Sequence, residues 1–219
     1  HALAALASVA RTDCRLVATM EPSMSPDEAC TLPTTWSTVH QAWLAARPLA
    51  GSALLLQAGA GGVGLAAAEY ARWLRAGGAA ATAGKPQKHH FLRSARLFDA
   101  TTSSREPAAF ALGLPTQLRA RRLHSVLNSL SADFIAVSFA LLREGGRLCE
   151  IGKRAVWSYE RREAASAAAR YVAIALDSTI EQAPWWMGRT LRLLSARLAS
   201  RVLHGLPLRC FELEGGVQS

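Results

Sequence analysis

Three glycines at the spacing G-x-G-x-x-G constrain the fold of this chain more than any other feature. Gly59, Gly61 and Gly64 follow a short apolar run at 52–57 and precede an Ala-rich segment with helical periodicity. In a strand-turn-helix unit the first glycine permits the tight turn, the second lets a ligand approach the backbone, and the third lets the helix pack closely on the strand. The helix N-terminus then presents free N–H groups to an anion. The pattern predicts a phosphate-binding turn, with glycines needed only for packing as the alternative.

Segments with strand and helix character alternate along the rest of the chain. Strands are expected at 53–57, 79–83, 124–128, 147–151, 171–176 and 206–213, and helices at 34–46, 63–76, 87–97, 134–142 and 184–203. This alternation predicts an α/β fold, a Rossmann-like doubly wound parallel sheet with helices on both faces. Several expected strands end in polar residues, and ligands of such sheets bind beyond the carboxyl ends of the strands.

The composition limits the classes of partner. The net charge is +9, which raises the hypothesis of a nucleic-acid partner. The arginines are scattered, however, and no basic stripe with interleaved aromatic residues occurs, so we expect no nucleic acid. No run of 18 apolar residues lacks charges or breakers, so we expect no membrane span.

The cysteines indicate neither a metal site nor a disulfide framework. Cys14, Cys30, Cys149 and Cys210 form no C-x-x-C pair, and none has a histidine at ligand spacing. We therefore expect free thiols in a reducing, cytoplasmic compartment, and no bound metal.

The segment after the second expected strand indicates which dinucleotide would bind. NAD requires a carboxylate there for its ribose 2′-hydroxyl, whereas the segment 81–90 holds no acid and two lysines. A 2′-phosphate needs cations and would be repelled by a carboxylate. The sequence therefore predicts NADPH, with Lys88 as the first contact, followed by Lys85 and Thr82; the alternative is a basic loop exposed to solvent.

Longer stretches of the chain match a known family. The matching stretches are Gln57–Ala67, Ser103–Arg105, Val126–Leu130 and Gly145–Lys153, with Leu32–Trp43 upstream. These stretches occur in the order and at about the separations that are typical of one family. The chain resembles the enoylreductase domain of modular polyketide synthases and animal-type fatty acid synthases. These domains belong to the zinc-free medium-chain dehydrogenase/reductase superfamily. The resemblance covers nearly the whole chain.

The resemblance implies a reaction and its residues. The family reduces the double bond of an enoyl chain on an acyl carrier protein thioester, with hydride from NADPH to the β-carbon and a proton to the α-carbon. Lys153 and Asp177 match the residues proposed to help deliver the proton. A surface lysine and a helix cap are the alternatives for these two. The implied cofactor contacts, besides the three glycines and the residues after the second strand, are Gly62, Val63, Arg105, Asn128 and Ser129.

The resemblance also implies three parts and a set of partners. Residues 1–45 would be the tail of a GroES-like substrate-binding subdomain with a connecting helix, 46–180 the NADPH-binding domain, and 181–219 a helix and strand returning towards the substrate subdomain. The chain begins with His1, and we interpret it as a piece that holds the cofactor half and lacks part of the substrate half. Other synthase domains, and a second copy of the synthase, are the expected partners.

One segment departs from the family. At 111–124 the family has a glycine-rich turn and an acid, whereas this chain has arginines and His124. Two further hypotheses therefore stay open: a non-catalytic scaffold domain of a synthase, and a stand-alone enzyme similar to quinone oxidoreductases.

Overall fold

The structure is a computed structural model that describes residues 9–119, 121–130, 133–153, 157–165 and 168–210. Contacts within the chain divide it into two units. The first unit combines residues 1–37 with 179–219, and the second unit is the continuous segment 38–178. Each unit is described on its own below.

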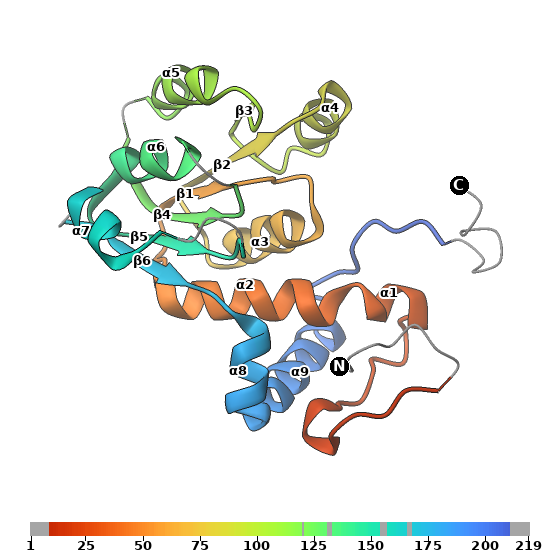
Figure 1. Cartoon of the computed structure of the whole chain (residues 1–219). Coiled ribbons are helices and arrows are strands. Elements are labelled where there is room, and N and C mark those ends of the chain that lie inside the picture. Colours follow the sequence, from red (N-terminus) through yellow and green to blue (C-terminus); the bar gives the residue numbers. More distant parts are fainter. Residues whose placement is uncertain (1–8, 120, 131–132, 154–156, 166–167, 211–219) are drawn as a thin grey trace, which may run out of the picture. The chain divides into compact units, whose positions relative to one another are not determined.

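The second unit is built on a six-stranded parallel sheet (Figure 1). Its strands are β1 (Ala53–Leu56), β2 (Gly78–Ala83), β3 (Ala100–Ser103), β4 (Leu123–Asn128), β5 (Leu142–Glu150) and β6 (Arg170–Ala173). The spatial order is β3-β2-β1-β4-β5-β6, and all pairs are parallel. The strand order reverses between β1 and β4, which opens a crevice at their carboxyl ends. The predicted doubly wound α/β fold is confirmed.

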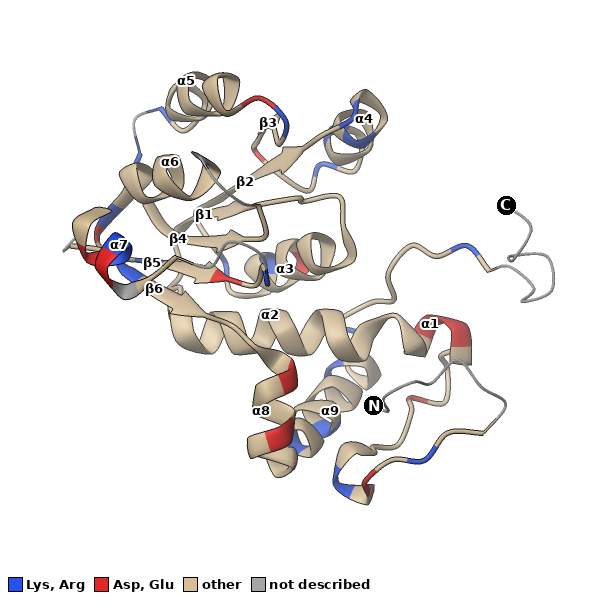
Figure 2. Cartoon of the chain, in the orientation of Figure 1, with Lys and Arg blue, Asp and Glu red and all other residues tan. Residues whose placement is uncertain are grey.

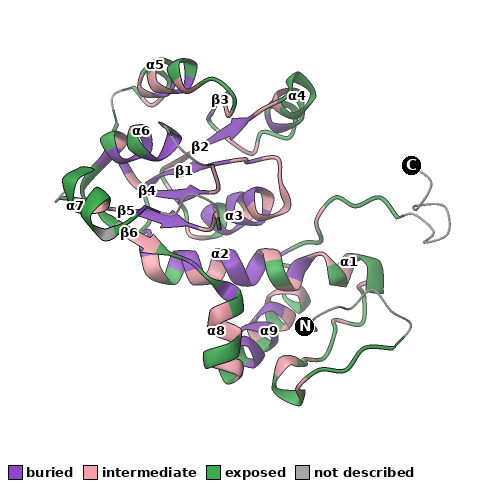
Figure 3. Cartoon of the chain, viewed as in Figure 1, coloured by how far each residue is buried: buried purple, intermediate pink, exposed green. Residues whose placement is uncertain are grey.

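The central strands form because their residues suit burial on both faces. All four residues of β1 are buried, as is typical of a strand covered by helices on both sides. Neither β1 nor β4 contains an acidic residue, lysine or arginine (Figure 2), and both are coloured as buried over most of their length in Figure 3. Continuous burial fixes the sheet centre, and polar side chains are left at the strand ends.

Helices cover both faces of this sheet. They are the end of α2 (Leu32–Ala46), α3 (Gly62–Trp73), α4 (Pro86–Ser94), α5 (Pro107–Gln117), α6 (Asp133–Leu141) and α7 (Tyr159–Ala165), while α8 (Leu176–Gln182) follows β6. On one face Phe110 and Phe134 pack with ring centroids 5.4 Å apart over Leu55 and Leu148. On the other face lie α3 and the end of α2 (Figure 1), where the Cys149 thiol donates to the Ala42 carbonyl oxygen at 3.5 Å.

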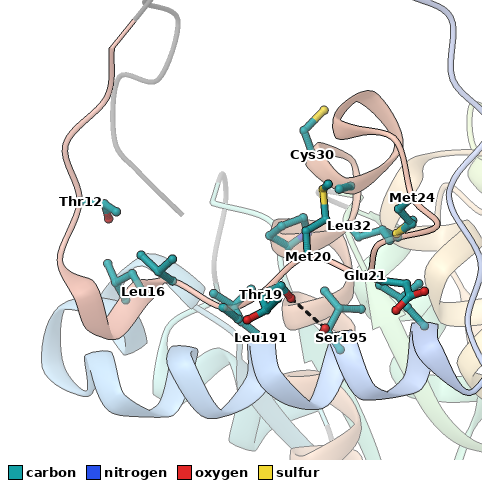
Figure 4. A pocket seen from close by; sticks show the side chains of 16 residues that line it. Thr12, Leu16, Thr19, Met20, Glu21, Met24, Cys30, Leu32, Leu191 and Ser195 are labelled. Atoms are coloured by element: carbon teal, nitrogen blue, oxygen red, sulfur yellow. Dashed lines mark hydrogen bonds between the residues drawn. The ribbon is translucent and has the colours of Figure 1, made fainter.

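The first unit holds η1 (Cys14–Leu16), α1 (Pro26–Cys30) and α9 (Pro184–Ala199), together with the start of α2. An apolar hollow of about 370 Å³ lies within it, with Leu16, Met20 and Leu191 among its lining residues (Figure 4). At its edge the Ser195 hydroxyl donates to the Thr19 carbonyl oxygen at 2.8 Å. Glu21 is the one acid among the described residues that line this hollow, so these residues form no cluster of acids.

Some expected elements differ from the structure. The strand expected at 171–176 ends at Ala173, and Leu176 already begins α8. Of the strand expected at 206–213, residues 206–210 form none, and the rest lies outside the described residues. The sequence does not predict β3, because Ala-Thr-Thr-Ser has no apolar run, and it does not predict α5, because Gly113 and Pro115 are helix breakers.

No helix in the described part of the chain has both the length and the apolar character that crossing a bilayer requires.

Arginine occupies helix ends where glycine is usual. Among the described residues, five of the six non-glycine residues with positive φ are arginines that follow a helix by one or two positions: Arg47, Arg75, Arg96, Arg119 and Arg201. This position at a helix end favours glycine, because a left-handed conformation costs other residues about 1–2 kcal/mol.

Replacing one of these arginines with glycine is therefore expected to stabilise the protein. In Arg96→Gly, the strain energy removed from the folded state exceeds the entropy cost of ordering a glycine on folding. The free energy of unfolding should therefore rise by about 0.5 kcal/mol. Arg93→Gly, inside the same helix, is the matched control and should cost about 1 kcal/mol. Urea unfolding measures both. Equal losses in the two variants would show that Arg96 is not strained.

Candidate functional site

Two of the three glycines are required by packing. A Cβ added to Gly59 would lie 2.5 Å from the Cβ of Ala81, and one added to Gly64 would lie 2.6 Å from the Cα of Gly59. Both glycines are buried. The start of α3 therefore rests directly on the turn after β1, which matches the role expected for the third glycine, whereas Gly59 is constrained by its contact with Ala81 of β2.

Gly61 is different, because packing gives it no reason to be glycine. A Cβ added there would meet only the carbonyl oxygen of Ala58, at 3.3 Å, and its φ of −90° and ψ of 165° suit any residue. Gly61 is the N-cap of α3, and no side chain caps this helix end. The first amides of the helix, from Gly62 and Val63 onward, therefore face a half-exposed surface where an anion fits.

A buried polar network holds the loop from below. The Thr82 hydroxyl accepts from the Ala58 N–H at 2.9 Å and donates to Gln57 Oε1 at 2.8 Å. Gln57 Nε2 in turn donates to the Ser138 hydroxyl at 3.2 Å. These bonds hold Ala58 at a φ of 52°, in the left-handed region.

The network assigns Thr82 a different place from the one that the sequence predicts. Instead of facing a cofactor, Thr82 is fully buried, and its hydroxyl is already used twice. It lies under the loop and positions it. The sequence does not predict Gln57 or Ser138 as site residues. The sequence signal that could have identified Gln57 is its position as a single polar residue directly after the apolar strand β1.

The predicted cations gather beyond β2 and β3. Lys85 is the N-cap of α4, Lys88 lies in the first turns of that helix, and both are exposed. Arg105 follows the end of β3, and its Nε would lie 2.8 Å from a Cβ built on Gly84. Gly84 directly precedes Lys85, so the Arg105 side chain reaches the segment that follows β2. Figure 2 shows the blue of lysine and arginine on α4 and beside β3. Glu106 is an acidic residue next to Arg105 in the sequence. No salt bridge within the described residues involves these three cations.

Lys153 and Asp177 meet although 24 residues separate them. Lys153 Nζ lies 2.5 Å from Asp177 Oδ2, and the two side chains are 78% and 55% exposed. The hydrogen bond from Lys153 lowers the pKa of the Asp177 carboxyl below its usual value. An ion pair this exposed contributes little to folding stability.

Asn128 and Glu150 tie together the two loops that carry Ser129 and Lys153. The Asn128 amide donates to Glu150 Oε2 at 2.5 Å and to the Leu130 carbonyl oxygen at 2.6 Å, and Glu150 Oε1 accepts from the Gly152 N–H at 2.6 Å. Both side chains are buried, and burial raises the pKa of Glu150. Asn128 Oδ1 is buried without a hydrogen-bond partner among the described residues. The sequence does not predict Glu150 as a site residue; its signal is a single acid inside a buried strand.

Metal-ligating and nucleophilic groups do not gather here. Among the described residues, no three His, Cys, Asp or Glu side chains lie close enough to hold a metal ion. The Cys149 thiol is buried in β5, and burial raises its pKa to about 12, so it stays protonated at neutral pH. The geometry instead combines an N-terminus of α3 without a side-chain cap, exposed cations after β2 and β3, and one exposed ion pair.

Comparison with known proteins gives the family. No family model matches the chain. Erythronolide synthase EryA2 of Saccharopolyspora erythraea is 33% identical over 210 residues, covering 95% of this chain and 6% of the synthase. The solved CurK enoyl reductase is 31% identical with a TM-score of 0.83, covering 91% of this chain and 59% of that one.

The chain belongs to the enoyl reductase domains of polyketide synthases. The nucleotide-binding subdomain of the PpsC enoylreductase domain from Mycobacterium tuberculosis is 26% identical with a TM-score of 0.70. That match covers 80% of this chain and 97% of the subdomain. This chain therefore contains the counterpart of nearly that whole subdomain, while it spans 59% of the solved CurK chain. The family resemblance seen in the sequence is confirmed, as is its place among medium-chain oxidoreductases.

The glycine loop gives a test that separates packing from binding. Gly64→Ala forces a Cβ against the backbone of Gly59 and should lower the free energy of unfolding by about 1–3 kcal/mol. Gly61→Ala meets one oxygen at 3.3 Å and should cost less than about 1 kcal/mol, yet weaken dinucleotide binding at least tenfold. Urea unfolding and calorimetric titration measure the two effects. Unchanged binding by Gly61→Ala would contradict the assignment of this surface to a ligand.

Proposed function

We propose that this chain binds NADPH in the crevice between β1 and β4 and takes part in reducing an enoyl thioester carried on an acyl carrier protein. The observation that carries this proposal is a juxtaposition at one edge of one sheet. The glycine loop, the Lys85–Lys88–Arg105 cluster and the Lys153–Asp177 pair all follow carboxyl ends of its strands.

The residues present fit NADPH. The uncapped start of α3 and the open space at Gly61 would receive the pyrophosphate. Lys85, Lys88 and Arg105 would receive the 2′-phosphate, because they follow β2 and β3 and no carboxylate neutralises them by a salt bridge within the described residues. Asn128, with its unused Oδ1, and Ser129 would lie beside the nicotinamide ribose.

The chemistry then divides between cofactor and protein. When bound, NADPH would supply hydride to the β-carbon of the enoyl group. Lys153 would hold a proton at Nζ for the α-carbon, and Asp177, which accepts a hydrogen bond from Nζ, would orient the lysine side chain. Asn128 and Glu150 would hold the two loops at the distance that this geometry requires.

Cofactor choice is the first test. Lys88→Ala should raise the Kd for NADPH about tenfold, equivalent to about 1.4 kcal/mol, and leave the Kd for NADH unchanged, because only NADPH carries the 2′-phosphate. Isothermal titration calorimetry measures both constants. Arg93→Ala removes another exposed cation from the same helix and is the matched control. If the folded chain binds neither nucleotide, the scaffold hypothesis replaces this one.

Proton delivery is tested separately. In the full-length polypeptide that carries this chain, Lys153→Ala or Asp177→Asn should lower kcat for enoyl thioester reduction about 100-fold, with the Kd for NADPH unchanged. Asp13→Asn breaks another exposed ion pair, Arg15–Asp13, and should have no effect. Full activity in the Lys153 and Asp177 variants would reduce the pair to a surface contact.

A further inference from the structure

A basic hollow lies at the opposite edge of the sheet from the glycine loop. Its volume is about 280 Å³. It is lined by residues 49–52 before β1, Ala53 at the start of β1, Arg121 and Arg122 before β4, His124 in β4, and Arg143 in β5. These residues precede or begin strands, so they surround the amino ends of β1 and β4. Figure 2 shows the basic colour on the segment that leads into β4. We call this hollow the basic pocket.

The arginines of the basic pocket are held in place without being neutralised. Arg121 Nη1 donates to the Gly77 carbonyl oxygen at 2.9 Å, and Arg122 Nη1 donates to the carbonyl oxygen of Ala140. Both acceptors are uncharged. Within the described residues, no carboxylate forms a salt bridge with Arg121 or Arg122.

His124 orients the third guanidinium. Arg143 Nη2 donates to His124 Nδ1 at 2.7 Å, so Nδ1 is an acceptor and the ring proton lies on Nε2, facing the Arg47 carbonyl oxygen at 3.2 Å. Burial, followed by the charge of Arg143, lowers the pKa of His124. The imidazole is therefore neutral at neutral pH, and the positive charge resides on three guanidinium groups. Each guanidinium has five N–H donors, which is more than its contacts with the protein require.

Acids near the basic pocket leave this charge in place. Asp99 lies on the same side of Gly78 as Arg121: a Cβ on Gly78 would be 3.2 Å from Asp99 Oδ2 and 3.7 Å from Arg121 Nη1. The Asp99 carboxylate accepts from the Ala79 N–H at 2.8 Å and forms no salt bridge among the described residues. Glu144 follows Arg143 in β5 and is exposed. None of the described residues that line the hollow is acidic.

We propose that the basic pocket binds a phosphate or pyrophosphate group through Arg121, Arg122 and Arg143. Guanidinium forks match the oxygens of phosphate and bind them in pairs. The volume is below the usual range for drug-sized ligands, about 300–1,000 Å³, which favours a small anion. A concave site with fixed cations also favours a small anion over a flat acidic protein surface. The segment 111–124, which departs from the family pattern, supplies two of the arginines and His124.

The test must exclude the crevice near β1, which is the other anion site proposed above. The titration therefore uses a Lys85→Ala/Lys88→Ala double variant, in which the cations proposed for the 2′-phosphate are removed. If this variant still binds NADPH, it is saturated with NADPH before the titration. Calorimetric titration at constant ionic strength with inorganic pyrophosphate should give one site with a Kd below about 1 mM. ADP should bind the same site, and tighter binding than pyrophosphate would identify a nucleotide as the source of the phosphate.

Arg143 is the residue to change, because it is exposed and its Nη2 donates to a side chain, that of His124, whereas Arg121 and Arg122 donate to backbone carbonyl oxygens. Arg143→Gln should weaken pyrophosphate binding at least tenfold, Arg143→Lys should weaken it less, and Arg93→Gln should leave it unchanged. Equal affinity in Arg143→Gln would overturn the proposal. So would binding of polyglutamate without binding of pyrophosphate, since that result would point to an acidic protein partner. Neither result bears on NADPH binding.

Discussion

The contact between the backbones of Gly59 and Gly64 determines the shape of the candidate site. With no side chain on either residue, the start of α3 lies directly on the turn that leaves β1. A methyl group on Gly64 would push helix and turn apart, and one on Gly59 would collide with Ala81 of β2. The Thr82 and Gln57 network secures the same turn from beneath, where the peptide at Ala58 takes a left-handed conformation. The surface left above, at Gly61, is the part of the loop that packing does not explain.

A second connection extends this order across the sheet. Asn128 ends β4 and Glu150 ends β5, and their buried hydrogen bond joins the loops that carry Ser129 and Lys153. Lys153 itself is exposed and reaches Asp177 at the start of α8. A buried polar pair thus supports an exposed ion pair, which is the arrangement that the proposed proton donor would need.

The sequence predicts the parts of the fold that depend on local pattern. It does not predict the parts that depend on contacts between residues far apart in the chain. The β1 turn, α3 and the alternation of strands and helices follow from the glycine spacing and apolar runs, and the structure confirms this fold. The position of β3 depends on pairing with β2, which its four residues do not reveal. The family resemblance singles out Lys153 and Asp177, but their contact distance depends on β5 and α8. The inward turn of Thr82 likewise emerges only once its partner Gln57, 25 residues away, is known.

The most direct test of the central claim uses the scarcity of lysine. The chain has three lysines, Lys85, Lys88 and Lys153. Rates of lysine acylation, measured by peptide mass spectrometry with saturating NADPH or NADH, would locate the cofactor on the folded chain. Slower acylation of Lys85 and Lys88 with NADPH, but not with NADH, is the predicted result. Equal acylation rates with NADPH, NADH and no nucleotide would contradict the assignment of this crevice to NADPH.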